Sequence, residues 1–123
     1  MDQGPYESIF VTNETYKHVV TINKCIKLNP KAIFVEKPFS HNEDGLTEIN
    51  ELIKKKKISF WIGYNFHFHK PFLRIKKLID KSVIGKVFYV RAFVGQDLRE
   101  WRSRDYRMSF SSKHDQGGGP VLE

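Results

Sequence analysis

Three short apolar runs, each followed by a segment with helical spacing, most constrain the fold of this chain. The runs are Ile9 to Val11, Ala32 to Val35 and Ile58 to Ile62. Behind them, apolar residues recur every three or four positions, as on one face of a helix: Val19, Ile22 and Ile26, then Leu46, Ile49, Leu52 and Ile53, then Phe72, Ile75, Leu78 and Ile79. Strands and helices that alternate in this way are typical of a parallel sheet with right-handed crossovers. The sequence therefore predicts an α/β fold.

Local signals place the ends of these elements. Asn29-Pro30 is a stop signal for the first helix, and Pro71 suits the first turn of the third. Ser40 and Glu43 have the spacing of a capping box, which predicts the start of the second helix. The run from Ala32 to Val35 lacks polar alternation, so we expect a strand that is covered on both faces.

The pattern changes after Lys86. Residues Val87 to Val94 alternate in the manner of a longer strand, whereas the chain from Gln96 to Pro120 is polar and irregular.

Composition excludes several classes of protein. The 123 residues are 40% hydrophobic and 14% aromatic, which is too rich in core-forming side chains for a disordered tail. Cys25 is the only cysteine, so no internal disulfide can form and a reducing cytoplasm is the expected compartment. Apolar runs fall far short of the roughly 18 residues that span a bilayer, and we expect no membrane partner.

Polar residues follow each of the three predicted strands. They are Thr12-Asn13, Glu36-Lys37-Pro38 and Tyr64-Asn65. Ligands of parallel sheets bind beyond the carboxyl ends of the strands, so these residues are the first candidates for a site. An ammonium such as that of Lys37 can hold a phosphate or a ribose hydroxyl, or pass a proton. The alternative is a surface Glu-Lys pair. The bond before Pro38 is a candidate for the cis form.

Other motifs have weaker interpretations. His67 and His69 alternate around Phe68, but no third ligand is evident, so we predict no metal site. Arginines interleaved with aromatic residues between Arg99 and Arg107, together with Lys54 to Lys57, suggest a nucleic-acid-binding module. Acidic residues interrupt the first group, and the lysines suit a solvated helix end. Nucleic acid is therefore the disfavoured alternative, despite a net charge of +7.

The order of these elements resembles the middle section of the Gfo/Idh/MocA family of NAD(P)-dependent oxidoreductases. The resemblance rests on five segments: Ile9 to Asn13 followed by His18, Val35-Glu36-Lys37-Pro38, Gly63 to Phe68, Ile84-Gly85-Lys86-Val87, and Gly117 to Glu123. It implies a partial Rossmann-type parallel sheet that runs into the first strand of an α+β substrate domain. Residues 1–83 would then be the C-terminal part of the NAD(P)-binding domain, and residues 84–123 the start of the substrate and oligomerisation domain.

The resemblance also implies a chemistry and its residues. The cofactor would be NAD or NADP, and hydride would pass to or from the hydroxyl-bearing carbon of a sugar, nucleotide-sugar or cyclitol. Lys37 would be catalytic. The substrate would lie beside Tyr64, Asn65 and His67, and His67 stands where the family usually has Arg. The cofactor would lie beside Thr12, Asn13, Glu36, Lys37, Pro38, Trp101 and Arg102.

The sequence contains no glycine-rich loop of the kind that cradles a dinucleotide or nucleotide phosphate. We therefore expect a chain truncated at both ends relative to the family, inactive alone and prone to form a homo-oligomer through uncovered strand edges. Besides the nucleic-acid-binding module, the remaining alternative is a non-catalytic oligomerisation remnant.

Overall fold

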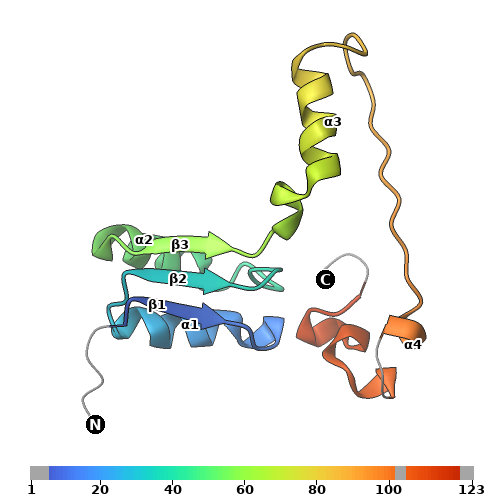
Figure 1. The fold of residues 1–123 in the computed structure, drawn as a ribbon. Coiled ribbons are helices and arrows are strands. Elements are labelled where there is room, and N and C mark those ends of the chain that lie inside the picture. Colours follow the sequence, from blue (N-terminus) through green and yellow to red (C-terminus); the bar gives the residue numbers. More distant parts are fainter. Residues whose placement is uncertain (1–5, 102–104, 120–123) are drawn as a thin grey trace.

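The computed structural model describes residues 6–101 and 105–119 of the chain. A parallel sheet of three strands in the order β1-β2-β3 forms its centre (Figure 1). A helix follows each strand, which confirms the predicted α/β alternation. The elements of this part are β1 (Ser8–Val11), α1 (His18–Lys27), β2 (Ala32–Val35), α2 (Leu46–Lys56), β3 (Ser59–Ile62) and α3 (Lys70–Asp80).

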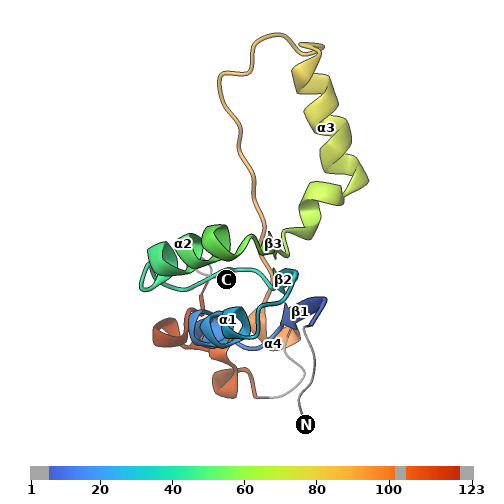
Figure 2. The same cartoon turned by 90° about the vertical axis from the view of Figure 1, so that its left-hand side faces the viewer.

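Helices α1 and α2 lie on the same face of the sheet (Figure 2). Alternate strand residues, such as Val11, Ile33 and Val35, face them and are buried. The helices contribute the residues that the helical spacing predicts, because these share the inward face of each helix. The buried hydrophobic core of the described residues comprises Val11, Ile22, Cys25, Ile26, Ile33, Val35, Ile49 and Ile58.

The other face of the sheet corrects one expectation. Phe10, Phe34 and Trp61 lie in register across the three strands, and Phe10 and Trp61 are 68% and 62% exposed. The apolar strand Ala32–Val35 is therefore covered on one face rather than two in the described part of the chain. An unbroken apolar run indicates that both faces of a strand are apolar, but it does not indicate which segment covers the second face.

Helix α2 begins at Leu46, three residues after Glu43, and the predicted capping box is not formed. Ser40 Oγ instead accepts a hydrogen bond from the backbone N–H of Asn42, at 3.2 Å. The side chain of Asn42 bonds to Asp44 in turn. Short polar side chains that bond to the nearby backbone compete with helix formation, which explains the later start.

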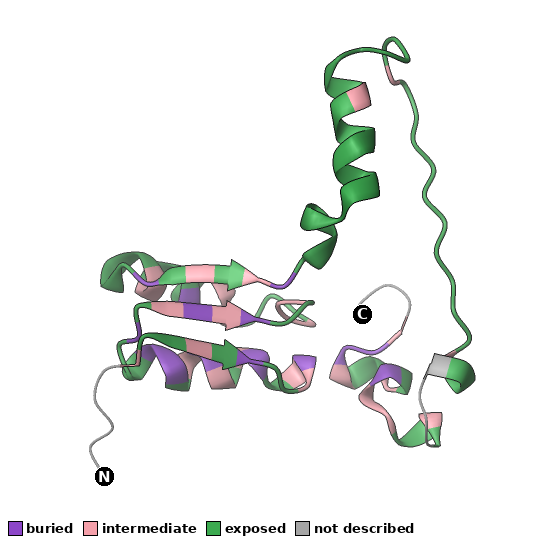
Figure 3. Ribbon diagram, viewed as in Figure 1, coloured by how far each residue is buried: buried purple, intermediate pink, exposed green. Residues whose placement is uncertain are grey.

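Helix α3 forms where the sequence predicts it, with Pro71 in its first turn, but its apolar residues do not face a core. The helix projects from the end of β3, and its residues are exposed apart from the half-buried Leu78 (Figures 1 and 3). The helical spacing predicts that Phe72, Ile75, Leu78 and Ile79 point toward a core, and this prediction is wrong, because Phe72, Ile75 and Ile79 are exposed and Leu78 is only half-buried. A row of apolar residues on one face of a helix favours burial of that face, but it does not determine which segment covers it.

Beyond α3 the chain returns toward the sheet as an extended segment. The predicted strand over Val87 to Val94 is not formed, because the described residues place no second strand beside it. The helix α4 (Leu98–Trp101) follows, and then three 3-10 turns, η3 (Tyr106–Met108), η4 (Phe110–Ser112) and η5 (His114–Gln116). We call residues 105–119 the C-terminal unit. The division into domains at residues 83 and 84 stays a prediction.

Candidate functional site

The carboxyl ends of the three strands meet at one edge of the sheet. Val11, Val35 and Ile62 are in register at the ends of β1, β2 and β3. Two further backbone bonds continue the ladder, from Glu36 N to Val11 O at 2.9 Å and from Gly63 N to Val35 O at 2.8 Å. The polar residues that follow each strand consequently lie at the same edge, as the parallel topology requires.

The turn after β2 is held by its own carboxylate. Glu36 Oε2 accepts a hydrogen bond from the backbone N–H of Lys37, at 2.8 Å. Glu36 Oε1 lies so close to Gly63 that a Cβ at that residue would be 3.3 Å from it. A glycine at the end of β3 therefore lets the Glu36 carboxylate pack against the neighbouring strand. The peptide bond between Lys37 and Pro38 is cis.

A cavity of about 790 Å³ opens beside this turn. Its lining includes Lys37, Tyr64, Asn65 and His67, so the structure brings together the predicted catalytic residue and the three predicted substrate-binding residues. Tyr64 and Asn65 follow β3 directly, and His67 belongs to the 3-10 turn η2 (Asn65–Phe68). The remaining lining residues are Phe66, Phe72, Leu73, Lys76 and Val94. The walls are thus largely apolar and aromatic, with two ammonium groups, an amide and an imidazole among them.

The α3 wall of the cavity was not foreseen from the sequence. Phe72 and Leu73 line it because α3 projects past the end of β3, whereas the apolar spacing had placed Phe72 in a core. Lys76 is held by Asp80 one turn later, with Nζ 2.9 Å from Oδ2. His69 packs against the rings of Phe66 and Phe72, and unlike His67 it is not among the residues that line the cavity. Pro71 was the signal that a helix starts here.

The predicted cofactor-binding residues divide into three groups, of which the first is Lys37 in the cavity lining. Thr12, Asn13, Glu36 and Pro38 lie at the strand ends, outside the cavity lining. Asn13 Nδ2 donates to Thr21 Oγ1 of α1, at 2.8 Å. Trp101 ends α4, but its side chain lies outside the described structure, and Arg102 lies outside the described residues.

The C-terminal unit reaches the same end of the sheet. Gly117 is buried and has a φ of 81°, and a Cβ there would be 2.5 Å from the Cβ of His41 and 3.5 Å from Cγ2 of Thr15. His41 belongs to the chain between β2 and α2, and Thr15 to the 3-10 turn η1 (Thr15–Lys17) after β1. The glycine segment that the resemblance includes is therefore packed against the connections that follow β1 and β2.

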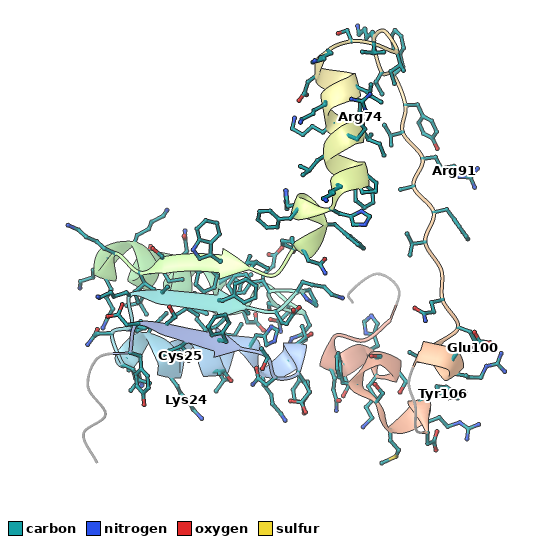
Figure 4. The ribbon with its side chains drawn as sticks, in the orientation of Figure 1. Lys24, Cys25, Arg74, Arg91, Glu100 and Tyr106 are labelled. Atoms are coloured by element: carbon teal, nitrogen blue, oxygen red, sulfur yellow. The ribbon has the colours of Figure 1, made fainter. Side chains whose placement is uncertain are left out.

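The sequence raised two other kinds of site, a metal site and a nucleic-acid-binding surface, and the described residues support neither. Within residues 6–101 and 105–119, no group of three or more His, Cys, Asp or Glu side chains could hold a metal ion. Hydrogen bonds from the side chain and backbone of Arg99 lower the pKa of Asp97 to about 2, so this arginine is engaged within the chain. Figure 4 shows Lys24 on α1, Arg74 on α3 and Arg91 on the extended segment that follows α3, so these basic side chains come from separate elements. No helix of the described part is long and apolar enough to cross a membrane.

Comparison with known proteins gives consistent relatives. No protein-family model matches the sequence. The chain is 28% identical over 85 residues to the myo-inositol 2-dehydrogenase of Thermotoga maritima, covering 69% of this chain and 25% of that enzyme. It is 29% identical over 79 residues to the uncharacterized oxidoreductase YrbE of Bacillus subtilis, covering 64% and 23%. The chain thus spans about a quarter of the length of the curated relatives it matches.

Solved structures show the same likeness. The crystal structure of an oxidoreductase from Desulfitobacterium hafniense, named as NADPH-dependent, matches 66% of this chain and 23% of its own, with 30% identity and a TM-score of 0.61. The apo scyllo-inositol dehydrogenase of Lactobacillus casei shares the fold over 65% of this chain and 24% of its own, with 20% identity and a TM-score of 0.59. The chain resembles the middle section of the inositol dehydrogenase-like oxidoreductases of the Gfo/Idh/MocA family.

Proposed function

We propose that this chain supplies the nicotinamide and substrate side of an NAD(P)-dependent oxidoreductase that acts on a hydroxyl of a sugar, nucleotide-sugar or cyclitol. The observation that carries the proposal is the cavity at the carboxyl ends of parallel strands, where Lys37, Tyr64, Asn65 and His67 meet. The relatives named for inositol oxidation support a polyhydroxylated substrate.

The residues of the cavity suit one end of the cofactor. Two of its rings, Phe66 and Phe72, offer flat apolar surface to a planar ring such as nicotinamide. The bound dinucleotide supplies the hydride chemistry, while the protein supplies orientation and electrostatics. The absence of a glycine-rich loop from the sequence leaves the pyrophosphate without its usual cradle. The fit therefore concerns the nicotinamide end, and we propose that the chain is inactive alone.

The proposed roles follow from the chemistry of the side chains. Lys37 contacts the substrate hydroxyl and assists the proton transfer that accompanies oxidation of its carbon. The hydroxyl groups of the substrate hydrogen-bond to Tyr64, Asn65 and His67. Thr12, Asn13, Glu36, Pro38, Trp101 and Arg102 contact the cofactor. Each of these roles is a proposal.

Compartment and assembly are proposed on separate grounds. A single cysteine, Cys25, which is buried, supports a reducing cytoplasm.

The exposed row of Phe10 and Trp61 on the open sheet face supports a homo-oligomer, since association would remove these rings from water.

The proposal predicts an uneven contact with NADH. In saturation-transfer NMR on the full chain, we expect the nicotinamide protons to receive more saturation than the adenine protons, because the described cavity fits that end of the molecule. Lys37→Met should weaken the effect at least about fivefold, as expected for the loss of a charged hydrogen-bonding group. The matched control is Lys55→Met, which removes an exposed lysine of α2 far from the cavity.

Two results would count against the proposal. Stronger saturation of the adenine protons, or an equal loss in both lysine variants, would show that the cavity is not the nicotinamide site. Measurable turnover of myo-inositol with NAD⁺ by the chain itself would contradict its inactivity alone.

A further inference from the structure

His18 is a buried polar residue to which neither the sequence nor the proposed chemistry assigns a role. It begins α1 and is 1% exposed. Buried polar side chains are nearly always hydrogen-bonded, so the partners of this ring indicate what it does.

The ring lies between two turns at the edge of the sheet. Nδ1 is 3.0 Å from the carbonyl oxygen of Pro38 and 3.2 Å from that of Phe39, and Nε2 is 2.9 Å from that of Asn13. Asn13 belongs to the turn after β1, and Pro38 and Phe39 belong to the turn after β2. One side chain therefore faces both turns that carry predicted site residues.

All three partners are carbonyl oxygens, which only accept hydrogen bonds, so the ring must be the donor in each bond. A neutral imidazole has one N–H and can donate to one turn, whereas the doubly protonated ring can donate to both. In every protonation state His18 ties at least one of the turns to the start of α1.

These bonds act where the sheet itself no longer holds the chain. The last backbone bond between the connections after β1 and β2 runs from Glu36 N to Val11 O. The contacts of His18 lie further along both connections, at the carbonyl oxygen of Asn13 after β1 and at that of Pro38, the residue after Lys37. The side chain of Asn13 is also bonded to α1, through Thr21. Residues in the first half of α1 therefore contact the turn after β1 and the turn after β2, the two turns that carry predicted site residues.

We propose that His18 is a positioning residue that fixes the turn carrying Lys37 relative to Asn13: its buried ring lies between the two turns and donates a hydrogen bond to a backbone carbonyl of at least one of them. Its link to cofactor binding rests on the proposed function. The positioning itself does not, because the turn is held in the absence of any ligand.

The test compares three variants of the full chain by NMR. His18→Phe keeps a ring and removes both nitrogens, and His18→Gln keeps N–H groups that can reach one turn. Cys25→Ala is the matched control, since Cys25 is buried on the same helix but faces the core. The first readout is the set of carbonyl ¹³C shifts of Asn13, Pro38 and Phe39, with the amide hydrogen exchange of Lys37. The second is the saturation of the nicotinamide protons of NADH.

In His18→Phe we expect the carbonyl shifts of at least one of the two turns, that of Asn13 or those of Pro38 and Phe39, to move to the values of carbonyls that accept no hydrogen bond. Exchange at Lys37 should rise, and saturation of the nicotinamide protons should fall, each about fivefold or more. His18→Gln should restore the carbonyl shift of one turn and part of the binding, and Cys25→Ala should leave both readouts unchanged. If the phenylalanine variant does not fold, this graded effect in His18→Gln carries the test.

The outcomes separate the two proposals. Carbonyl shifts that stay unchanged in both His18 variants would overturn the positioning role, and so would equal NADH binding by the wild type and by a His18→Phe variant whose turns have moved. If the shifts move as expected but NADH binds to none of the proteins, the positioning role stands and the proposed function fails.

Discussion

Gly118→Ala is expected to disrupt the C-terminal unit while leaving the sheet folded. Gly118 is buried, and a Cβ there would overlap the backbone of η4, with its closest contact at the carbonyl oxygen of Phe110 and a distance of 2.6 Å to the carbonyl oxygen of Ser111. Backbone atoms cannot rotate aside as the end of a flexible side chain can. Overpacking of this kind costs about 1–3 kcal/mol, so the opened population of the unit should rise at least about fivefold.

Limited trypsin digestion measures this effect. Lys113 lies within the C-terminal unit and is half-buried, and cleavage after it requires local opening. Cleavage after Lys113 should become at least about fivefold faster in Gly118→Ala. The matched control is Gly95→Ala in the extended segment, where the nearest atom would be 3.9 Å from the new Cβ and no positive φ is required. Equal cleavage rates in the two variants would show that the packing of Gly118 does not hold the unit.

Ile33→Ala should produce the largest loss of global stability. Ile33 is fully buried in the central strand, between Ile9 and Phe60 of the neighbouring strands, and beneath the two helices. Large-to-small changes at such positions cost about 2–5 kcal/mol. That is a large share of the roughly 5–15 kcal/mol by which whole domains are stable, so a substantial unfolded fraction is expected at 25 °C.

Urea unfolding, followed by the fluorescence of Trp61 in β3, measures the change. Val20→Ala on α1 removes two methyl groups from a side chain that is 58% exposed, and it should change the unfolding free energy by less than about 0.5 kcal/mol. Ile33→Val should fall between the two, at about 0.5–1.5 kcal/mol. A midpoint for Ile33→Ala within the error of that for Val20→Ala would mean that β2 is not at the centre of the core.

The sequence predicted the elements that are determined by local periodicity. The apolar runs identified all three strands, and the spacing of Ile22, Ile26 and Ile49 identified the helix faces that are buried. The start of α2 was not predicted correctly, because the Ser40 hydroxyl can accept a hydrogen bond in a turn as readily as at the start of a helix. The open sheet face and the exposed stripe of α3 could not be predicted, since apolar spacing reports a preference for burial and not the partner.

The candidate site was predicted in part for the same reason. Residues that directly follow parallel strands must share an edge, so Lys37, Tyr64 and Asn65 could be placed together from sequence order alone. Lys76 and Val94 reach the cavity only through the path that the chain takes after β3. The three carbonyls around His18 come from two different turns, and their meeting depends on the packing of α1 against the sheet.

The proposed function requires that nicotinamide binds at the carboxyl edge of this sheet. The most direct test is an NMR titration of the ¹⁵N-labelled full chain with NADH, followed at every backbone amide. We expect progressive shifts of the amides of Asn13, Lys37, Tyr64 and Asn65, with the amides of the α2 lysines, Lys54 to Lys56, unchanged. Shifts that are confined to those lysines, or their absence at the strand ends at saturating NADH, would contradict the proposed function.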